Sequence, residues 1–322
     1  MAPSTTETSP TDETVLTLRK VLVSESEPLA RRFRALFSLK HLACLQPPTE
    51  KTLPAIQAIA AAFASGSALL KHELAYCLVV KDGEEDAMCR HEAAEALGAL
   101  GYAESLDILK KLRDDENEPE IIRETCDIAV DRILWENSEE RKAEKLKPSD
   151  FASIDPAPPM PLQASEPDIP KLEKTLLDTK LPLFQRYRAM FGLRDLASPP
   201  DLPTAKDAVN ALAKGLKDPS ALFRHEVAFV FGQLCHPASI PCLTECLSDL
   251  QEVGMVRHEA AEALGSLGDE DGVEDTLRKF LNDPEQVVRD SVIVALDMAE
   301  FEKNGEIEYA LVPDGKAAVP VA

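Results

Sequence analysis

Four histidines of this chain are each followed directly by a glutamate, and these pairs are its strongest candidates for chemistry. The chain has six histidines and 57 acidic residues among 322, so a random successor is acidic roughly one time in six. The four pairs also occupy equivalent places, just inside a predicted helix and just after a basic residue: His72-Glu73, His91-Glu92, His225-Glu226 and His258-Glu259. One such pair usually forms a solvated polar face, but four in register indicate metal binding.

The geometry of a helix decides how a metal can use these pairs. Adjacent helical residues diverge by about 100°, so one pair does not clamp a metal with both side chains. Inner helices of neighbouring helical repeats lie about 8–10 Å apart, which brings His72 near His91 and His225 near His258. Two imidazoles and a carboxylate with open positions match non-haem Fe(II) sites, and two facing sets can hold two metals. The rival, a hydrolytic zinc site, lacks its usual HExxH spacing.

The remaining histidines and one cysteine pair are interpreted as structural. His41 and His236 have no following glutamate and no matching copy elsewhere in the chain. Cys242 and Cys246 are four residues apart and share a helix face, but no second Cys or His pair stands nearby at zinc-finger spacing. Packing is therefore the expected role of both cysteines.

The sequence segments that contain the His-Glu pairs occur twice along the chain. Four landmarks recur in the same order at offsets of roughly 153 to 167 residues, which indicates an internal duplication. The matched stretches are 28–39 with 182–193, 71–76 with 224–229, 90–98 with 257–265, and 119–123 with 284–289.

Each half has the pattern of stacked helix pairs. Prolines stand where helices should start, glycines lie near helix ends, and apolar residues recur at i, i+3 and i+4. Units of roughly 30–40 residues with this pattern predict an all-α superhelix, an α-solenoid in which each repeat buries its apolar face on the next. We expect a tail at 1–15, a first half at 16–137, a linker at 138–170, a second half at 171–303 and a tail at 304–322, with both tails disordered.

The region between the halves has a different composition. A charge run at 139–142 is followed by seven prolines between Pro148 and Pro170, which predicts an extended, semi-rigid linker. The alternative is an ordered loop on the surface of one half.

The first half is shorter than the second at one place. His225 and His258 are 33 residues apart, but His72 and His91 are only 19 apart. The second half uses this interval for an outer helix at 239–247, whereas the first has only residues 79–86 there. We therefore predict that one outer helix is missing near 79–86, since about ten extended residues still span the return. The alternative is a tolerated loop deletion.

Composition narrows the class of protein. The formal net charge of −22 argues against binding to a phosphate backbone, so no nucleic-acid partner is expected. No apolar run approaches the roughly 20 residues of a membrane span, and the N-terminus lacks the features of a secretory signal. Seven cysteines without a CxxC pair fit a reducing compartment.

The segments KHELAYCL, RHEAAEALGALG, RHEVAFVFGQL and RHEAAEALGSLG together resemble deoxyhypusine hydroxylase, a family of all-helical HEAT-repeat dimetal mono-oxygenases. The resemblance covers residues from about 16 to 303. It implies hydroxylation of the deoxyhypusine side chain on the precursor of translation initiation factor 5A, which completes hypusine. It also implies two Fe(II) per chain, O2 as oxidant, a monomer without a membrane partner, and a cytoplasmic location, with the nucleus as a second one.

Carried over residue by residue, the resemblance implies two ligand sets. One iron is held by His72, His91 and Glu92, and the other by three residues of the second half, His225, His258 and Glu259. Glu73 and Glu226 are then either further ligands or the catalytic-site acids that receive the cationic amine of the substrate. Deoxyhypusine is a long aliphatic amine, so carboxylates beside the metals would hold it by charge-assisted hydrogen bonds.

Two other functions compete with the enzyme. Most α-solenoids bind partners on a concave face and catalyse nothing, so a non-catalytic scaffold is one alternative. The other is a HEAT protein that resembles bilin lyases, although that likeness lies in the repeats and not in the His-Glu pairs. Iron analysis of the purified protein separates the enzyme from both.

Overall fold

The computed structural model describes residues 10–44, 47–75, 85–144, 151, 154–161 and 168–304. Across these ranges the regular structure is helical, which confirms the predicted all-α class. None of the described helices is both long and apolar enough to cross a bilayer. The α-helices are α1 (Pro10–Val23), α2 (Leu29–Cys44), α3 (Thr52–Ala61), α4 (Ala68–Ala75), α5 (Ala87–Leu100), α6 (Leu106–Arg113), α7 (Glu120–Glu136), α8 (Glu139–Ala143), α9 (Ile169–Leu177), α10 (Leu183–Ala197), α11 (Ala205–Ala213), α12 (Ala221–Leu234), α13 (Ile240–Ser248), α14 (Gly254–Gly265), α15 (Val273–Arg278) and α16 (Gln286–Asn304).

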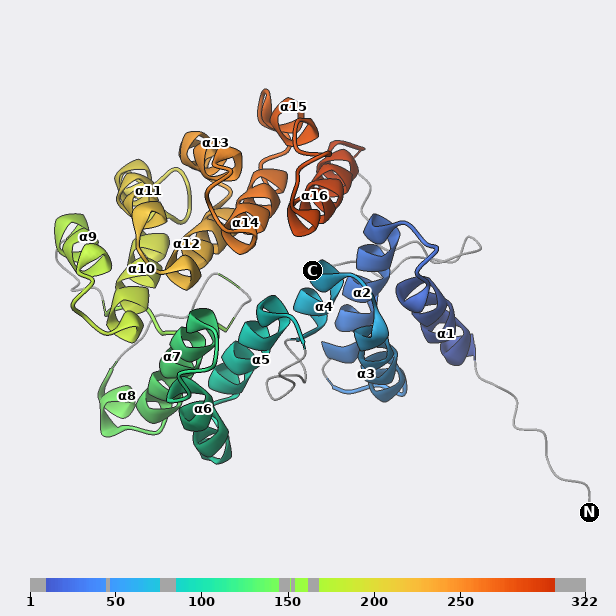
Figure 1. Cartoon of the computed structure of the whole chain (residues 1–322), viewed down its shortest axis with the longest axis horizontal. Coiled ribbons are helices and arrows are strands. Elements are labelled where there is room, and N and C mark those ends of the chain that lie inside the picture. The colour runs from blue at the N-terminus through green and yellow to red at the C-terminus, as the bar shows by residue number, and fades with distance from the viewer. Residues whose placement is uncertain are drawn as a thin grey trace, which may run out of the picture.

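The second half consists of four helix pairs, each an outer helix followed by an inner one. The outer helices α9, α11, α13 and α15 alternate with the inner helices α10, α12, α14 and α16, and the four pairs form one row in Figure 1. The first half repeats this order with α1 and α2, α3 and α4, and α6 and α7. Among the described residues, α5 is an inner helix with no outer helix before it.

A buried arginine fastens an inner helix to the outer helix before it. In three repeats its Nε donates a hydrogen bond to the backbone carbonyl of the residue ten positions earlier, over 2.9 to 3.0 Å. The pairs are Arg32 with Leu22, Arg186 with Leu176 and Arg257 with Leu247. Because buried donors need acceptors, each bond fixes how the two helices of a repeat sit together.

The same arginine of α5 lacks this bond. Arg90 is buried and its guanidinium donates to Glu118 at 2.8 Å, but its Nε has no partner in the part of the chain that the structure describes. Residue 80, ten positions earlier, and most of the stretch 79–86 predicted to lack a helix lie outside the described residues. Of that stretch, Asp86 caps α5 by accepting a hydrogen bond from the Met88 backbone N–H at 2.9 Å.

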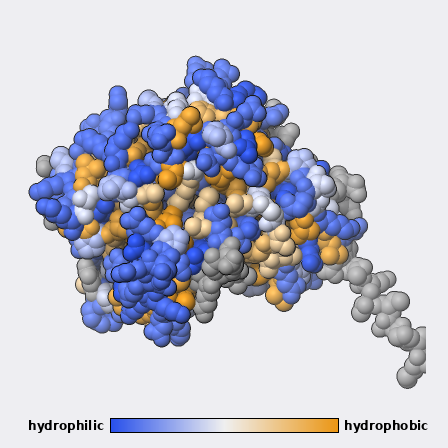
Figure 2. Space-filling model, in the orientation of Figure 1, coloured by the Kyte–Doolittle hydropathy of each residue, from blue (hydrophilic) through white to orange (hydrophobic). Residues whose placement is uncertain are grey.

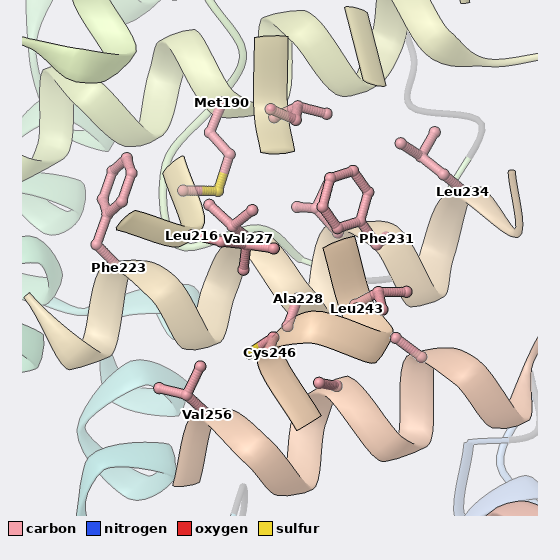
Figure 3. Close-up of a cluster of buried hydrophobic side chains, with 14 of the residues drawn as sticks. Met190, Leu216, Phe223, Val227, Ala228, Phe231, Leu234, Leu243, Cys246 and Val256 are labelled. Atoms are coloured by element: carbon pink, nitrogen blue, oxygen red, sulfur yellow. The ribbon is translucent and has the colours of Figure 1, made fainter. Parts of the chain in front are cut away.

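The hydrophobic core differs between the halves in the same way. In the second half one cluster of buried side chains runs continuously from α9 to α16, and Figure 3 shows part of it, where Val227 of α12 lies beside Leu216 and below Met190 of α10. Among the described residues of the first half, one cluster belongs to α1–α4 and a separate one to α5–α7. The break falls between α4 and α5, where the second half has α13.

The inner helices of the two halves face each other. Helix α16 packs against α2 and α4, and α7 packs against α10 and α12. An ion pair of 2.6 Å between Arg34 and Asp297 joins α2 to α16, and the Ser220 hydroxyl donates to Glu124 at 2.8 Å across the other end. Apolar side chains gather along the middle of the molecule where the rows meet, whereas the outer helices carry mostly hydrophilic ones (Figures 1 and 2).

Two regions contain ordered structure where the sequence predicted a disordered tail and a linker. Helix α1 begins at Pro10, inside the range expected to be a tail, and its buried Val15 and Leu18 belong to the core of α1–α4. The stretch expected to link the halves contains α8 and, after it, the buried Asp155 and Ala157. The composition of this stretch identified its prolines but did not predict the burial of Asp155 and Ala157.

Candidate metal centre

Each histidine of the four His-Glu pairs is the fifth residue of its inner helix. His72, His91, His225 and His258 lie on α4, α5, α12 and α14, one turn after the helix start. Side-chain caps fix two of these starts: Asp86 begins α5, and the Ser220 hydroxyl accepts a hydrogen bond from the Phe223 backbone N–H at 3.1 Å before α12. The four imidazoles therefore occupy equivalent positions on their four helices.

The four imidazoles form one buried cluster between the halves. The ring centroids of His72 and His91 are 5.6 Å apart, and those of His225 and His258 are also 5.6 Å apart. Across the halves, the His72 ring is 5.2 Å from that of His258, and the His91 ring is 5.3 Å from that of His225. The structure therefore brings together all four histidines on which the sequence analysis focused.

Two groups of side chains have ligand atoms close enough to share a metal ion. In one, single atoms of His72, His91 and Glu92 lie within 4.8 Å of one another. In the other, the same holds for His72 with three residues of the second half, His225, His258 and Glu259. Both sequence-derived sets thus recur as neighbours, and His72 adjoins both.

The two remaining glutamates take different places beside the cluster. Glu73 Oε1 is 3.8 Å from His72 Nε2, at the edge of the imidazoles. Glu226 is buried, and its Oε1 has no hydrogen-bond partner in the described structure. Neither belongs to the two close groups of possible ligands, so their role between metal and substrate stays a prediction.

Several atoms of the cluster that are able to bind a metal are buried without a hydrogen-bond partner. Among the described residues these are both ring nitrogens of His91 and of His225, Nε2 of His258 and one oxygen of Glu226. Buried polar groups are normally satisfied, so an orphaned set of this kind is suited to binding a ligand. Imidazole and carboxylate donors suit divalent transition metals, so the residues present fit a metal centre.

Burial and mutual repulsion set the protonation of the imidazoles. Burial and the neighbouring imidazoles lower the pKa of His91 and of His258 well below its usual range, and lower that of His225 to about 4. For His72 burial also lowers the pKa, but the carboxylates of Glu92 and Glu73 outweigh it and raise the value to about 9. Three of the rings are therefore neutral near pH 7, the state in which imidazole binds a metal.

The carboxylates of the site repel one another. Burial, and then the charge of Glu262, raises the pKa of Glu259 and of Glu73, while burial and the charge of Asp155 raise that of Glu226. So many acids in one buried place are stabilised by cations placed among them. Dications and a cationic substrate both meet this requirement.

Sequence reasoning missed a second pair of acids, Glu95 and Glu262, three residues after Glu92 and Glu259. Glu262 Oε1 lies 3.5 Å from His258 Nδ1 and accepts a hydrogen bond of 2.9 Å from the Ser291 hydroxyl. The signal was present, because both copies of RHEAAEALG repeat this glutamate. Neither glutamate follows a histidine directly, so the His-Glu pattern does not include them.

The other two histidines lie outside the cluster. His41 is in the last turn of α2, and His236 Nδ1 accepts a hydrogen bond of 3.1 Å from the Ala238 backbone N–H at the start of a short 3-10 helix. The capping bond supports the structural role that was predicted for His236.

A cavity of about 290 Å³ opens beside the cluster, between α2, α12, α14 and α16. We call it the open cavity. Its walls are apolar and include the rings of Phe33, Phe37 and Phe229. Carboxylates of the site, among them Glu73 and Glu259, line it as well. An elongated aliphatic chain with a positive charge matches these surfaces.

Comparison with known proteins decides the family. The chain is 80% identical over 327 residues to deoxyhypusine hydroxylase of Emericella nidulans, covering 97% of both proteins, and 79% identical over 333 residues to that of Aspergillus fumigatus, covering 99% of both. The chain belongs to the deoxyhypusine hydroxylase family. A solved structure of human deoxyhypusine hydroxylase matches 90% of this chain and 97% of its own, with 43% identity and a TM-score of 0.76.

Family models and chain length add two facts about this deoxyhypusine hydroxylase. A model described as HEAT repeats matches residues 186–297, and one described as PBS lyase HEAT-like repeat matches residues 90–115, a single repeat. The likeness to bilin lyases is therefore confined to the repeat. The alignment with the Aspergillus fumigatus protein spans 333 positions but this chain has 322 residues, so at least 11 positions of the relative have no counterpart here.

Proposed function

We propose that this deoxyhypusine hydroxylase acts on the deoxyhypusine side chain of the precursor of translation initiation factor 5A, with two Fe(II) ions and O2. The observation that carries the proposal is the buried cluster of four imidazoles, three of which have ring nitrogens without a hydrogen-bond partner among the described residues, flanked by glutamates on both sides. A scaffold has no need for such a cluster, since burying these groups without a ligand destabilises the fold.

The two close groups of side chains would hold the ions. His72, His91 and Glu92 form the first set, and His225, His258 and Glu259 form the second. Glu73 and Glu226 lie beside the sets with carboxylate oxygens to spare, as further ligands or as partners of the substrate amine. Each set alone has the two-histidine, one-carboxylate composition that suits Fe(II) and leaves positions open.

The open cavity is the place for the substrate side chain. The rings of Phe33, Phe37 and Phe229 would pack on its methylene groups, and Glu73 and Glu262 would attract its ammonium groups. The result is a side chain held in extended form with one carbon beside the metal ligands. This arrangement orients the substrate and excludes water from the apolar wall.

The overall reaction replaces one C–H bond of the side chain with C–OH. One oxygen atom of O2 enters the product, and the other leaves as water with two protons and two electrons from an external reductant. When bound, ferrous ions supply the redox chemistry that activates O2. The protein residues keep the imidazoles of His91 and His258 neutral, the ammonium groups anchored and the site dry.

Iron analysis and a product assay test the proposal together. We expect about two irons per purified chain and hydroxylated product on the deoxyhypusine-bearing factor. His72→Ala and His258→Ala should lose iron and product, whereas His236→Ala, which lies outside the cluster, should keep both. A folded wild-type chain that binds no iron when ferrous ion is supplied would overturn the proposal.

A further inference from the structure

The duplication gives the metal centre two equivalent mouths, each formed by inner helices of both halves. The open cavity is lined by Glu262, Val294 and Phe33. A second cavity, which we call the closed cavity, is lined by Glu95, Ile128 and Tyr187, their counterparts in the other copy of the repeat.

Local packing supports this correspondence. An added Cβ on Gly265 would meet Ala295 of α16 in the open mouth, and one on Gly98 would meet Ala129 of α7 in the closed mouth. Both alanines line their cavities. Both mouths are therefore built from the same three inner-helix positions around the same cluster of imidazoles.

The two cavities differ greatly in size. The open cavity holds about 290 Å³, and the closed cavity about 10 Å³. The smaller volume is about what a single water molecule needs, so the closed cavity has no room for an aliphatic side chain. The difference does not come from the matched residues, since Ile128 replaces Val294 and Tyr187 replaces Phe33 with little change in bulk.

The segment between the halves accounts for the difference. Pro156 lines the closed cavity, and the run from Asp155 to Pro158 is buried against it. This run, which we call the strap, belongs to the stretch that joins the two copies and so has no duplicate. The described residues that line the open cavity belong to α2, α4, α12, α14 with its C-cap Ser266, and α16, and none of them comes from the strap.

Two arginines of α10 hold the strap in place. Arg194 is fully buried and donates two hydrogen bonds of 2.8 Å to the Asp155 carboxylate. Arg188 donates to the Pro158 carbonyl at 3.2 Å, and its own carbonyl accepts a bond of 2.9 Å from the Met160 N–H. Bidentate arginine–carboxylate contacts fix geometry as well as energy, so the strap is anchored at both ends.

The counterparts of these arginines in the first copy have no strap to hold. Arg194 corresponds to Lys40, which is exposed, and Arg188 corresponds to Arg34, which instead binds Asp297 of α16. The anchoring residues thus differ between the copies together with the presence of the strap.

We propose that the strap seals one of two equivalent mouths of the metal centre, so that the substrate side chain enters through the open cavity between α2 and α16. The assignment rests on the proposed function, because that function identifies the open cavity as the substrate site. It adds that the four-histidine cluster, although nearly symmetric, is approached from one side. Asp155 and Pro156 then determine from which side the substrate approaches the four-histidine cluster.

A matched pair of cysteine variants tests the seal without measuring catalysis. Val294→Cys places a thiol in the open cavity and Ile128→Cys places one at the equivalent point of the closed cavity, and both native side chains are 3% exposed. Iron-loaded protein is treated with 2-aminoethyl methanethiosulfonate, a small cationic thiol reagent, and each site is followed by peptide mass spectrometry. We expect Val294→Cys to react at least tenfold faster.

A second pair of measurements isolates the strap. In the Ile128→Cys background, Pro156→Gly with Ala157→Gly removes the bulk of the strap but keeps the Asp155–Arg194 contact, and we expect labelling to approach the Val294→Cys rate. Equal rates in the first experiment, or no acceleration in the second with native circular dichroism, would overturn the seal. Spermidine should protect Val294→Cys from labelling, and its failure to do so would instead count against the proposed substrate site.

Discussion

The hydroxyl of Ser291 on α16 donates a hydrogen bond of 2.9 Å to Glu262 on α14, and both groups face Nδ1 of the His258 ring. Because burial keeps His258 neutral, a proton on Nδ1 facing Glu262 leaves Nε2 as the free acceptor. That Nε2 is buried without a partner among the described residues. The contact therefore orients the ring toward the other imidazoles, in a tautomer whose Nε2 is able to bind a metal.

Removal of this contact should weaken metal binding. We expect Glu262→Ala to lower iron affinity about 10- to 100-fold, the usual effect of losing the group that orients a ligating imidazole. Iron per chain, measured after dialysis against a graded series of chelator concentrations, reports the change. Asp269→Asn, an exposed acid just after the same helix, serves as the control and should titrate like the wild type. Unchanged iron retention in Glu262→Ala would refute the orienting role.

The buried ion pair between Arg257 and Asp283 should contribute strongly to stability. Asp283→Asn leaves the Arg257 guanidinium without its charged partner, which costs about 3 kcal/mol in free energy of unfolding. Urea denaturation at pH 7 measures it, and the exposed Asp275→Asn is the matched control. A loss no larger than that of the control would contradict the prediction.

The contribution of Asp283 should also depend on pH in a definite direction. Burial alone raises the pKa of Asp283, but hydrogen bonds from Arg257 and the Glu285 backbone N–H outweigh it and lower the value. A depressed pKa in the folded state means stability that is present above the unfolded value of about 3.9 and is lost as the pH falls through the folded value. The wild-type and Asp283→Asn unfolding energies should therefore converge below about pH 4 and differ at pH 7.

The sequence predicted the helical repeats and the histidines well, because both follow from local patterns. Landmarks that recur in order reveal a duplication, and a duplicated His-Glu pair at the fifth position of a helix must meet its copy once the helices stack. The roles of Asp155 and Ser291 were out of reach for the opposite reason. Each acts through partners 29 to 39 residues away in the chain, Glu262 for Ser291 and Arg194 for Asp155, and no periodicity marks such contacts.

Close approach of α14 and α16 should make Gly265 intolerant of a side chain. A Cβ at Gly265 would lie 2.6 Å from the Ala295 Cβ and 2.9 Å from its Cα, so the helices must separate. We expect Gly265→Ala to lose about 1–3 kcal/mol of stability, as overpacking usually does. Since the two helices carry His258 and Ser291, iron retention should fall as well. In Gly66→Ala, where the nearest atom is 3.9 Å away, neither quantity should change.

The shortened first half leads to the last prediction. The histidines of one half are 33 residues apart and those of the other half are 19 apart. In the described structure Arg90 Nε has no hydrogen-bond partner, whereas Arg257 Nε donates to the Leu247 carbonyl. Insertion of a 14-residue amphipathic helix after position 80, patterned on α13, would supply an equivalent carbonyl and cover the gap between the two first-half core clusters. The midpoint of thermal unfolding and the iron content should both rise, because α4 and α5 carry His72 and His91. A flexible Gly-Ser insert of the same length controls for spacing alone, and equal behaviour of the two inserts would show that the outer helix is dispensable.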